Sequence, residues 1–222
     1  MGPSNIAQRN SMQLENSSTS YGTVARTFHW LIAGLIVVQF ILAPIPENLP
    51  PGIHVQPPFG LDTAGVLARH KSFGMTVLLL MLVRLFWRRR SPPPRLPPTM
   101  KPLERRLAKI SHIAFYVILL AMPLSGWLVV QAKGSSASWF GLWTWPNFLE
   151  KSDAAYRAFS LTHEILSRMI FFLALLHIAA ALKHHFWNKD GVLVRMLPFG
   201  RERVAAPPRA ADGAPPQAGD VK

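Results

Sequence analysis

The feature that most constrains the fold is an apolar stretch, residues 161–185, that carries two histidines fourteen residues apart. In an α-helix, fourteen steps of about 100° end only ~40° short of four full turns, so His163 and His177 share one face. A rise of about 1.5 Å per residue separates them by ~21 Å, most of the ~30 Å hydrocarbon core of a bilayer. Polar side chains at that depth usually face the interior of a helix bundle. The stretch therefore predicts a membrane-spanning helix with imidazoles facing inward at two depths.

The composition agrees with a membrane protein and limits the possible metal ligands. Half of the 222 residues are hydrophobic and only 16% are charged, a balance typical of membrane proteins. The formal net charge of +13 would also suit nucleic acid. However, the Lys and Arg lie between apolar stretches, so membrane lipid is the predicted partner and nucleic acid is not. The absence of cysteine excludes iron–sulfur clusters and disulfides.

Four apolar stretches predict four membrane-spanning helices, over residues 28–46, 64–87, 107–130 and 161–185. The first twenty residues are polar and lack the apolar segment of a cleavable signal peptide, so the first span is expected to direct membrane insertion. Residues 1–20 and 200–222 are expected to be disordered tails around one four-span domain, 21–199. The predicted fold class is all-α, an integral membrane four-helix bundle.

The loop charges predict the orientation and, with it, two pairs of histidines. Arginine and lysine are concentrated after the second and fourth spans, which places both termini in the cytoplasm. His29 and His177 then lie near the cytoplasmic side, and His70 and His163 near the opposite side. A lone histidine at a helix end is more often an interfacial anchor or a core residue. Two pairs at two depths instead suit a flat cofactor with an axial ligand on each face, and two such centres form a transmembrane electron path.

Sequence motifs across all four spans resemble those of the bacterial cytochrome b561 family. In chain order they are FHW (28–30), RHKSFG (69–74), VRLFWR (83–88), SH (111–112), PLSGW (123–127), WFGL (139–142), THE (162–164), LHIAAALKHHFW (176–187) and GVLVRMLP (191–198). The resemblance implies a multi-pass, dihaem b cytochrome of the bacterial inner membrane that exchanges electrons with quinone. The haem iron ligands would be His29, His70, His163 and His177, and the quinone-binding histidines His112 and His184. Lys183 and Thr162 depart from the residues common in the family.

The position of His184 predicts where quinone would bind. It lies seven residues beyond His177, which keeps it on roughly the same helix face and ~10 Å nearer the cytoplasm. With His112 in the opening turns of the third span, the expected site lies between the start of that span and the end of the fourth. Histidine suits this role because it can donate a hydrogen bond to a quinone oxygen and supply a proton.

Three functions are compatible with these features. The resemblance makes a haem-dependent quinone oxidoreductase the leading hypothesis, with superoxide as the donor at the periplasmic face and ubiquinone as the acceptor. Because superoxide is an anion, Arg69, Lys71 and Lys133 are expected to attract it, unless these charges only cap helices and meet lipid headgroups. The second hypothesis is a cytochrome b anchor that relays electrons for a separate dehydrogenase or hydrogenase. The third is a His-lined metal transporter or sensor without haem, which would need intramembrane carboxylates.

Overall fold

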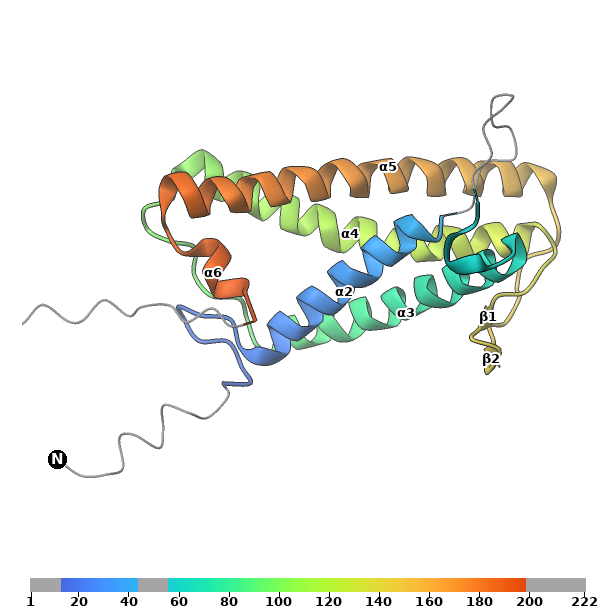
Figure 1. Ribbon diagram of the computed structural model, residues 1–222, viewed down its shortest axis with the longest axis horizontal. Helices are drawn as coiled ribbons and strands as arrows, with labels where there is room; N and C mark the ends of the chain where they lie inside the picture. The colour runs from blue at the N-terminus through green and yellow to red at the C-terminus, as the bar shows by residue number, and fades with distance from the viewer. Residues whose placement is uncertain (1–12, 44–55, 199–222) are drawn as a thin grey trace, which may run out of the picture.

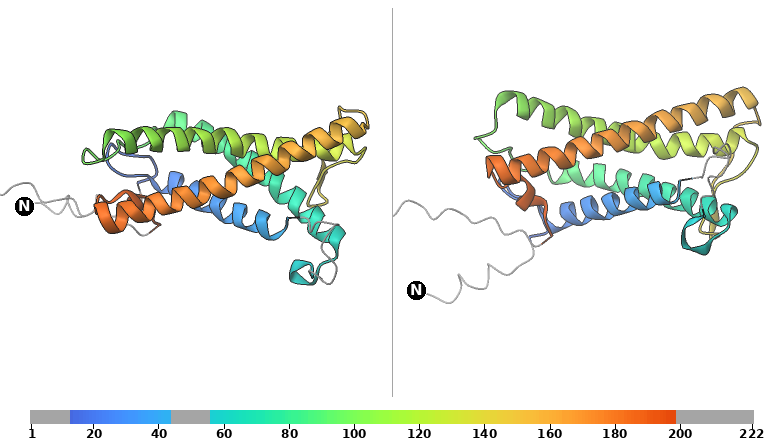
Figure 2. Two further views of the ribbon diagram at one scale, coloured as in Figure 1. Left: turned by 90° about the horizontal axis from the view of Figure 1, so that it is seen from above. Right: turned by 45° about the horizontal axis from the view of Figure 1, so that its top comes forward.

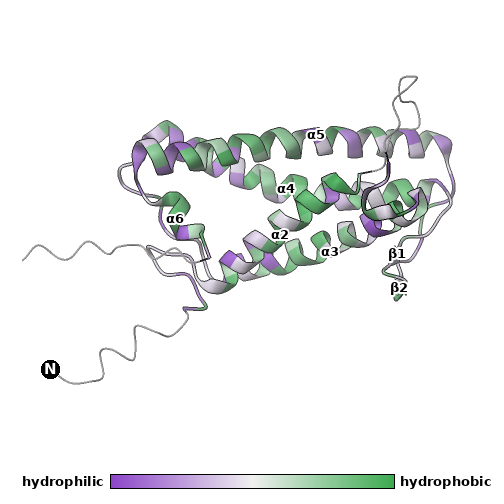
Figure 3. Cartoon of the chain, in the orientation of Figure 1, coloured by the Kyte–Doolittle hydropathy of each residue, from purple (hydrophilic) through white to green (hydrophobic). Residues whose placement is uncertain are grey.

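The protein is an elongated bundle of four antiparallel helices (Figures 1 and 2). The computed structural model describes residues 13–43 and 56–198. The long helices are α2 (Thr23–Ile41), α3 (Thr63–Arg90), α4 (Pro102–Ala132) and α5 (Asp153–Lys183). The short elements are a 3-10 turn η1 (Pro58–Gly60), the strands β1 (Ser138–Trp139) and β2 (Trp143–Thr144), a π-helical turn η2 (His184–Asn188) and α6 (Val192–Met196). All four long helices are long and apolar enough to cross a membrane, as their colouring in Figure 3 illustrates. The predicted four-helix membrane fold is confirmed.

The helix boundaries differ from those expected from hydropathy alone. Helix α2 begins at Thr23, before the predicted residue 28, and ends at Ile41; residues 44–46 of the predicted span lie outside the described residues. Helix α5 begins at Asp153, eight residues before the predicted start at residue 161. The reason is a cap, because the Ser152 hydroxyl accepts a hydrogen bond from the backbone N–H of Ala155 (3.3 Å). Capping and first-turn residues are polar, so hydropathy places the start of such a helix too late.

A cluster of buried apolar side chains joins the four helices in the middle of the bundle. Its members are Ile32 of α2, Val77 and Met81 of α3, Ile118 and Leu119 of α4 and Ile170 of α5. Ile170 lies midway in sequence between His163 and His177. The core therefore separates the two histidine levels, each of which lies about two helical turns from it.

One end of the bundle, called here the inner end, gathers both ends of the described chain (Figure 1). Trp30 Nε1 of α2 donates a hydrogen bond to the carbonyl of Met196 in α6 (2.8 Å). The Asn16 side chain donates to the carbonyl of Ser91, in the linker after α3 (2.9 Å). Residues 13–20, which the sequence placed in a tail, are therefore bonded to the bundle, while residues 1–12 and 199–222 lie outside the described residues. That this inner end faces the cytoplasm remains a prediction.

At the opposite, outer end, the loop between α4 and α5 folds back onto α3. The Ser72 hydroxyl accepts a hydrogen bond from the backbone N–H of Phe140 (2.9 Å). Trp139 Nε1, in β1, donates to Thr76 Oγ1 (3.0 Å). The side-chain oxygen of Gln131, a fully buried residue, accepts from the backbone N–H of Phe148 (2.8 Å). These bonds fix the outer loop beside the His70 end of α3.

Candidate functional site

The structure brings the four predicted histidines together as two pairs, one at each end of the bundle. His29 of α2 and His177 of α5 have ring centres 6.3 Å apart at the inner end. His70 of α3 and His163 of α5 have ring centres 6.3 Å apart at the outer end. Each pair joins two different helices, and α5 contributes one imidazole to each level.

The separation within each pair fits two ligands on opposite sides of one metal. An imidazole nitrogen binds a metal at about 2.0–2.1 Å, and the ring centre lies roughly 1.1 Å beyond the nitrogen, so two opposed imidazoles place their centres about 6.2–6.4 Å apart. Both pairs match this range. Among the described residues, no group of three or more His, Cys, Asp or Glu could hold a metal ion directly. The pairs therefore suit a metal whose remaining ligands come from a cofactor, as in haem.

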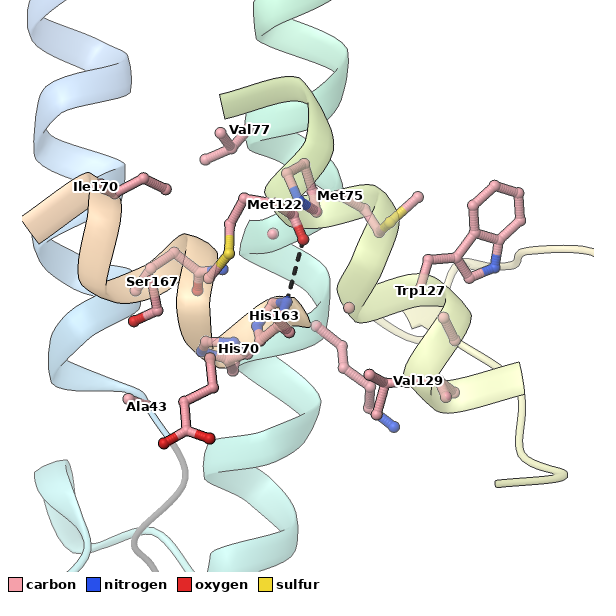
Figure 4. A pocket seen from close by; sticks show the side chains of 18 of the residues that line it. Ala43, His70, Met75, Val77, Met122, Trp127, Val129, His163, Ser167 and Ile170 are labelled. Carbon is pink, nitrogen blue, oxygen red and sulfur yellow. Dashed lines mark hydrogen bonds between the residues drawn. The ribbon is translucent and has the colours of Figure 1, made fainter. Parts of the chain in front are cut away.

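The outer pair lines a cavity of about 470 Å³, a volume within the range of ligand pockets. Figure 4 shows His70 and His163 in this cavity, with Met122 and Trp127 nearby. The cavity also depends on glycine, because a Cβ at Gly126 would lie only 2.9 Å from Cε1 of His163. Nδ1 of His70 is buried and makes no hydrogen bond of normal geometry among the described residues, although the backbone of Gln39 and Leu42 lies close to the ring. A cofactor-sized space, a missing Cβ and a buried imidazole together fit a haem at this level.

His163 is oriented by two groups of α4. Its Nδ1 lies 3.1 Å from the carbonyl of Met122, drawn as a dashed line in Figure 4, and 3.0 Å from the Ser125 hydroxyl. A carbonyl only accepts hydrogen bonds, so this contact places a proton on Nδ1. Nε2 of the neutral ring is then free to bind a metal, which is the arrangement that metal-ligating histidines usually show.

A third imidazole lies beside the inner pair. The ring centre of His112, on α4, is 5.9 Å from that of His177. Phe115, almost one turn further along α4, packs edge-on against the same His177 ring at 5.3 Å. The structure therefore assigns His112 to the edge of the inner pair. The sequence predicted that quinone binds between His112 and His184, and this site remains a prediction.

The second predicted quinone residue, His184, is held by a carboxylate that the sequence analysis did not identify. Nδ1 of His184 lies 2.5 Å from Oδ2 of Asp190, and these side chains are only 10% and 3% exposed. The backbone turns at Lys189, which lies between them and is left-handed with φ of 51°, and again just after Asp190 at Gly191, with φ of 74°. A carboxylate accepts hydrogen bonds, so Nδ1 carries a proton and Nε2 is left for a ligand. Helical periodicity could not have found Asp190, because the contact depends on this turn.

The three predicted anion-attracting residues lie at the outer end in different surroundings. Lys71 lines the cavity of the outer pair. Arg69 is exposed and donates to the carbonyl of Gly65 in its own helix (3.2 Å). Lys133 lies over the ring of Tyr156, 5.9 Å from its centre. The structure therefore brings only Lys71 to the cavity.

The two residues that depart from the family pattern have simple structural roles. Lys183, the last residue of α5, forms an ion pair with Glu104 in the first turn of α4. The pair links the two helices that flank the expected quinone site. The Thr162 hydroxyl donates to the carbonyl of Ala158 one turn earlier in the same helix (2.9 Å). Neither residue displaces a histidine of the two pairs.

Comparison with known proteins agrees with this architecture. A family model described as prokaryotic cytochrome b561 matches residues 20–199. "Cytochrome b561 homolog 2" of Escherichia coli is 32% identical over 188 residues, which cover 84% of this chain and 95% of the relative. "Probable superoxide oxidase CybB" of Yersinia pestis is 33% identical over 132 residues, 60% of this chain and 74% of the relative. "Cytochrome b562" of Cereibacter sphaeroides is 28% identical, over 80% of this chain and 94% of the relative.

Proposed function

Because the chain belongs to the prokaryotic cytochrome b561 family, we propose that it is a dihaem b cytochrome that passes electrons from superoxide to ubiquinone. Family membership makes it a multi-pass protein of the bacterial inner membrane and implies that it binds haem b. The number of haems, the donor and the acceptor are the proposed part. The similarity to a probable superoxide oxidase supports the choice of donor.

The observation that carries the proposal is the pair of 6.3 Å imidazole separations at the two ends of the bundle. His29 and His177 would hold one haem, and His70 and His163 the other. Haem with an imidazole on each face supplies one-electron redox chemistry and leaves no open position for a substrate. The helices place the two histidine levels ~21 Å apart, on either side of an apolar core.

The outer level is suited to receive electrons from a small anion. Lys71 lines the cavity next to His70 and His163, and its charge raises the local concentration of an anionic donor. Two superoxide anions release two electrons and two molecules of oxygen. Haem held by His70 and His163 would supply the one-electron acceptor for these electrons.

The inner level is suited to deliver electrons and protons to ubiquinone, which takes up two electrons and two protons to form ubiquinol. With a proton taken up from cytoplasmic water on Nε2, His184 would donate a hydrogen bond to one quinone oxygen, while its Nδ1–H stays bonded to Asp190. Proton transfer from Nε2 leaves a neutral ring whose remaining proton stays on Nδ1. His112, at the edge of the inner pair, would face the same quinone, and cytoplasmic water supplies the second proton.

The first experiment counts haem in the purified protein by its pyridine haemochrome spectrum. We expect two haems per chain in the unaltered protein and about one in each of His29→Ala, His177→Ala, His70→Ala and His163→Ala. A double variant that replaces both histidines of one pair should lose no more haem than either single variant. A double variant that replaces one histidine from each pair should lose both haems. Loss of the same haem in His29→Ala and His70→Ala would contradict the proposed pairing.

The second experiment tests donor and acceptor. Superoxide should reduce the haems within one turnover, and a ubiquinone analogue should reoxidise them. His112→Ala and His184→Ala should each keep two haems and accept electrons, yet lose transfer to the analogue. If a membrane dehydrogenase reduces the haems and superoxide does not, the result would favour the anchor-subunit hypothesis. A protein without haem would leave the metal transporter or sensor.

A further inference from the structure

Two arginines near the inner end of α3 turn toward the bundle. Arg84 and Arg88 lie one helical turn apart, so they share a face of α3. Both are half-buried, whereas the next two residues, Arg89 and Arg90, are exposed. The guanidinium carbons of Arg84 and Arg88 lie 5.9 and 5.2 Å from the centre of the Tyr116 ring on α4. The ring packs against both charges but does not neutralise them.

No carboxylate in the described part of the chain pairs with either arginine. The four ion pairs found there are Arg90–Glu15, Arg168–Glu164, Lys183–Glu104 and His184–Asp190. An ionisable side chain within a membrane span almost always has a counter-charge or a polar partner. Two guanidinium groups on one face, without a protein carboxylate, therefore predict an anion that comes from a bound molecule.

The surroundings of the arginines locate that anion beside the inner histidines. Arg84 follows His70 by fourteen residues on α3, the same interval that separates His163 from His177 on α5, so Arg84 lies at the level of the inner pair. Tyr21, just before α2, also lies within their field: burial raises the pKa of its phenol, and the charges of Arg88 and Arg84 oppose that rise. Two guanidinium forks, supplemented by a phenol that keeps its proton, form a site for oxyanions.

We infer that Arg84 and Arg88 bind the two propionate carboxylates of the haem held between His29 and His177. The inference rests on the proposed function, which places a haem there. Haem b carries two carboxylates, and the site offers two guanidinium groups. Lipid phosphate is the other source of an oxyanion at this depth. Propionate is favoured because Arg84 lies at the level of the inner pair and both arginines are half-buried beside Tyr116, whereas a lipid headgroup lies outside the helices.

The test is infrared difference spectroscopy of the complete dihaem protein, reduced minus oxidised. Cells grown with 5-aminolevulinate labelled with ¹³C at its carboxyl group yield haem labelled at the propionates, so label-sensitive bands belong to those carboxylates. We expect these bands to shift in Arg84→Gln and in Arg88→Gln. Arg89→Gln is the matched control, because Arg89 is an exposed neighbour on the same helix, and its bands should match those of the unaltered protein.

A second measurement follows haem release to excess apomyoglobin. Loss of one charged hydrogen bond should speed release of the inner haem about tenfold or more in Arg84→Gln or Arg88→Gln, and leave the outer haem unchanged. If Arg84→Gln does not fold, Arg84→Lys keeps the charge but loses the bidentate fork, and its bands should still shift.

The outcomes separate this inference from the proposed function. Unshifted propionate bands in both glutamine variants, in protein that retains two haems, overturn the inference and leave the dihaem assignment intact. Unshifted bands combined with less phospholipid per chain overturn it in favour of a lipid phosphate site. A His29→Ala protein that keeps two haems overturns the proposed function itself.

Discussion

One added methyl group at Gly126 tests the outer imidazole pair. A Cβ at this position would lie 2.9 Å from Cε1 and 3.2 Å from Nδ1 of His163. Non-bonded carbon atoms prefer about 3.5–4.0 Å, so in Gly126→Ala the ring must retreat by roughly 0.6 Å or more. A metal site tolerates distance errors of only about 0.2 Å. The imidazole can therefore keep its metal bond only if α4 and α5 move apart.

The expected size of the effect follows from packing energetics. Overpacking of this kind costs about 1–3 kcal/mol, and each 1.4 kcal/mol is a tenfold change in an equilibrium constant. We expect the affinity of the outer site for haem b to fall roughly 5- to 140-fold, with the inner site unaffected. The assay is haem transfer from the purified protein to excess apomyoglobin, followed by absorbance and a final haem count.

The matched control is Gly34→Ala on α2. Gly34 is exposed, and a Cβ there would meet no atom within 4 Å, so both haems should be released as in the unaltered protein. A Gly126→Ala protein that releases haem no faster than Gly34→Ala would refute the assignment of His163 as a ligand. Loss of the inner haem instead of the outer one would refute the assignment of levels.

Three further predictions concern the two membrane faces. Lys71→Glu should slow the reduction of the haems by superoxide, measured by stopped flow. Higher ionic strength should slow the same reaction in the unaltered protein, because the Debye length falls from about 30 Å at 0.01 M to about 8 Å at 0.15 M. A rate that changes with neither would indicate that Lys71 only contacts lipid. Asp190→Asn should keep two haems but reduce ubiquinone about ten- to a hundredfold more slowly, because His184 loses the carboxylate that holds its proton on Nδ1. Ubiquinone turnover at the unaltered rate would contradict this role of Asp190. Alkaline phosphatase fused after residue 222 should be inactive, because the arginine-rich linker after α3 is expected in the cytoplasm, and an active fusion would reverse the orientation.

Hydropathy and helical periodicity predicted much of the fold because both are local properties. Four apolar runs predicted four helices, and the interval between His163 and His177 predicted two imidazole levels on one helix. Pairing these with His29 and His70 required only the direction of each span, which follows from alternation across the membrane. The helix starts were less accurate, since caps such as Ser152 are polar and lie outside any apolar run.

The inner site shows where such reasoning stops. Placing His112 against His177 requires the lateral packing of α4 on α5, which no spacing within one helix determines. The bond between His184 and Asp190 requires a π-helical turn that ends at a left-handed residue, Lys189. The sequence has no glycine at that turn, because Lys189 adopts the left-handed conformation and Gly191 comes only after Asp190.

For the arginines of α3, the number of charges is less informative than their positions around the helix. The positive-inside rule treats Arg84, Arg88, Arg89 and Arg90 as equivalent markers of the cytoplasmic side. Consecutive helical residues point about 100° apart, however, so residues 88–90 cannot all face solvent or all face the bundle. Arg84 indicates which of these residues faces the bundle, because it shares a helix face with Arg88 and that face packs on Tyr116. The sequence thus contains a signal for an inward-facing cationic site. That signal can be recognised only when the shared face of Arg84 and Arg88 on α3 is considered together with Tyr116 of the neighbouring helix α4.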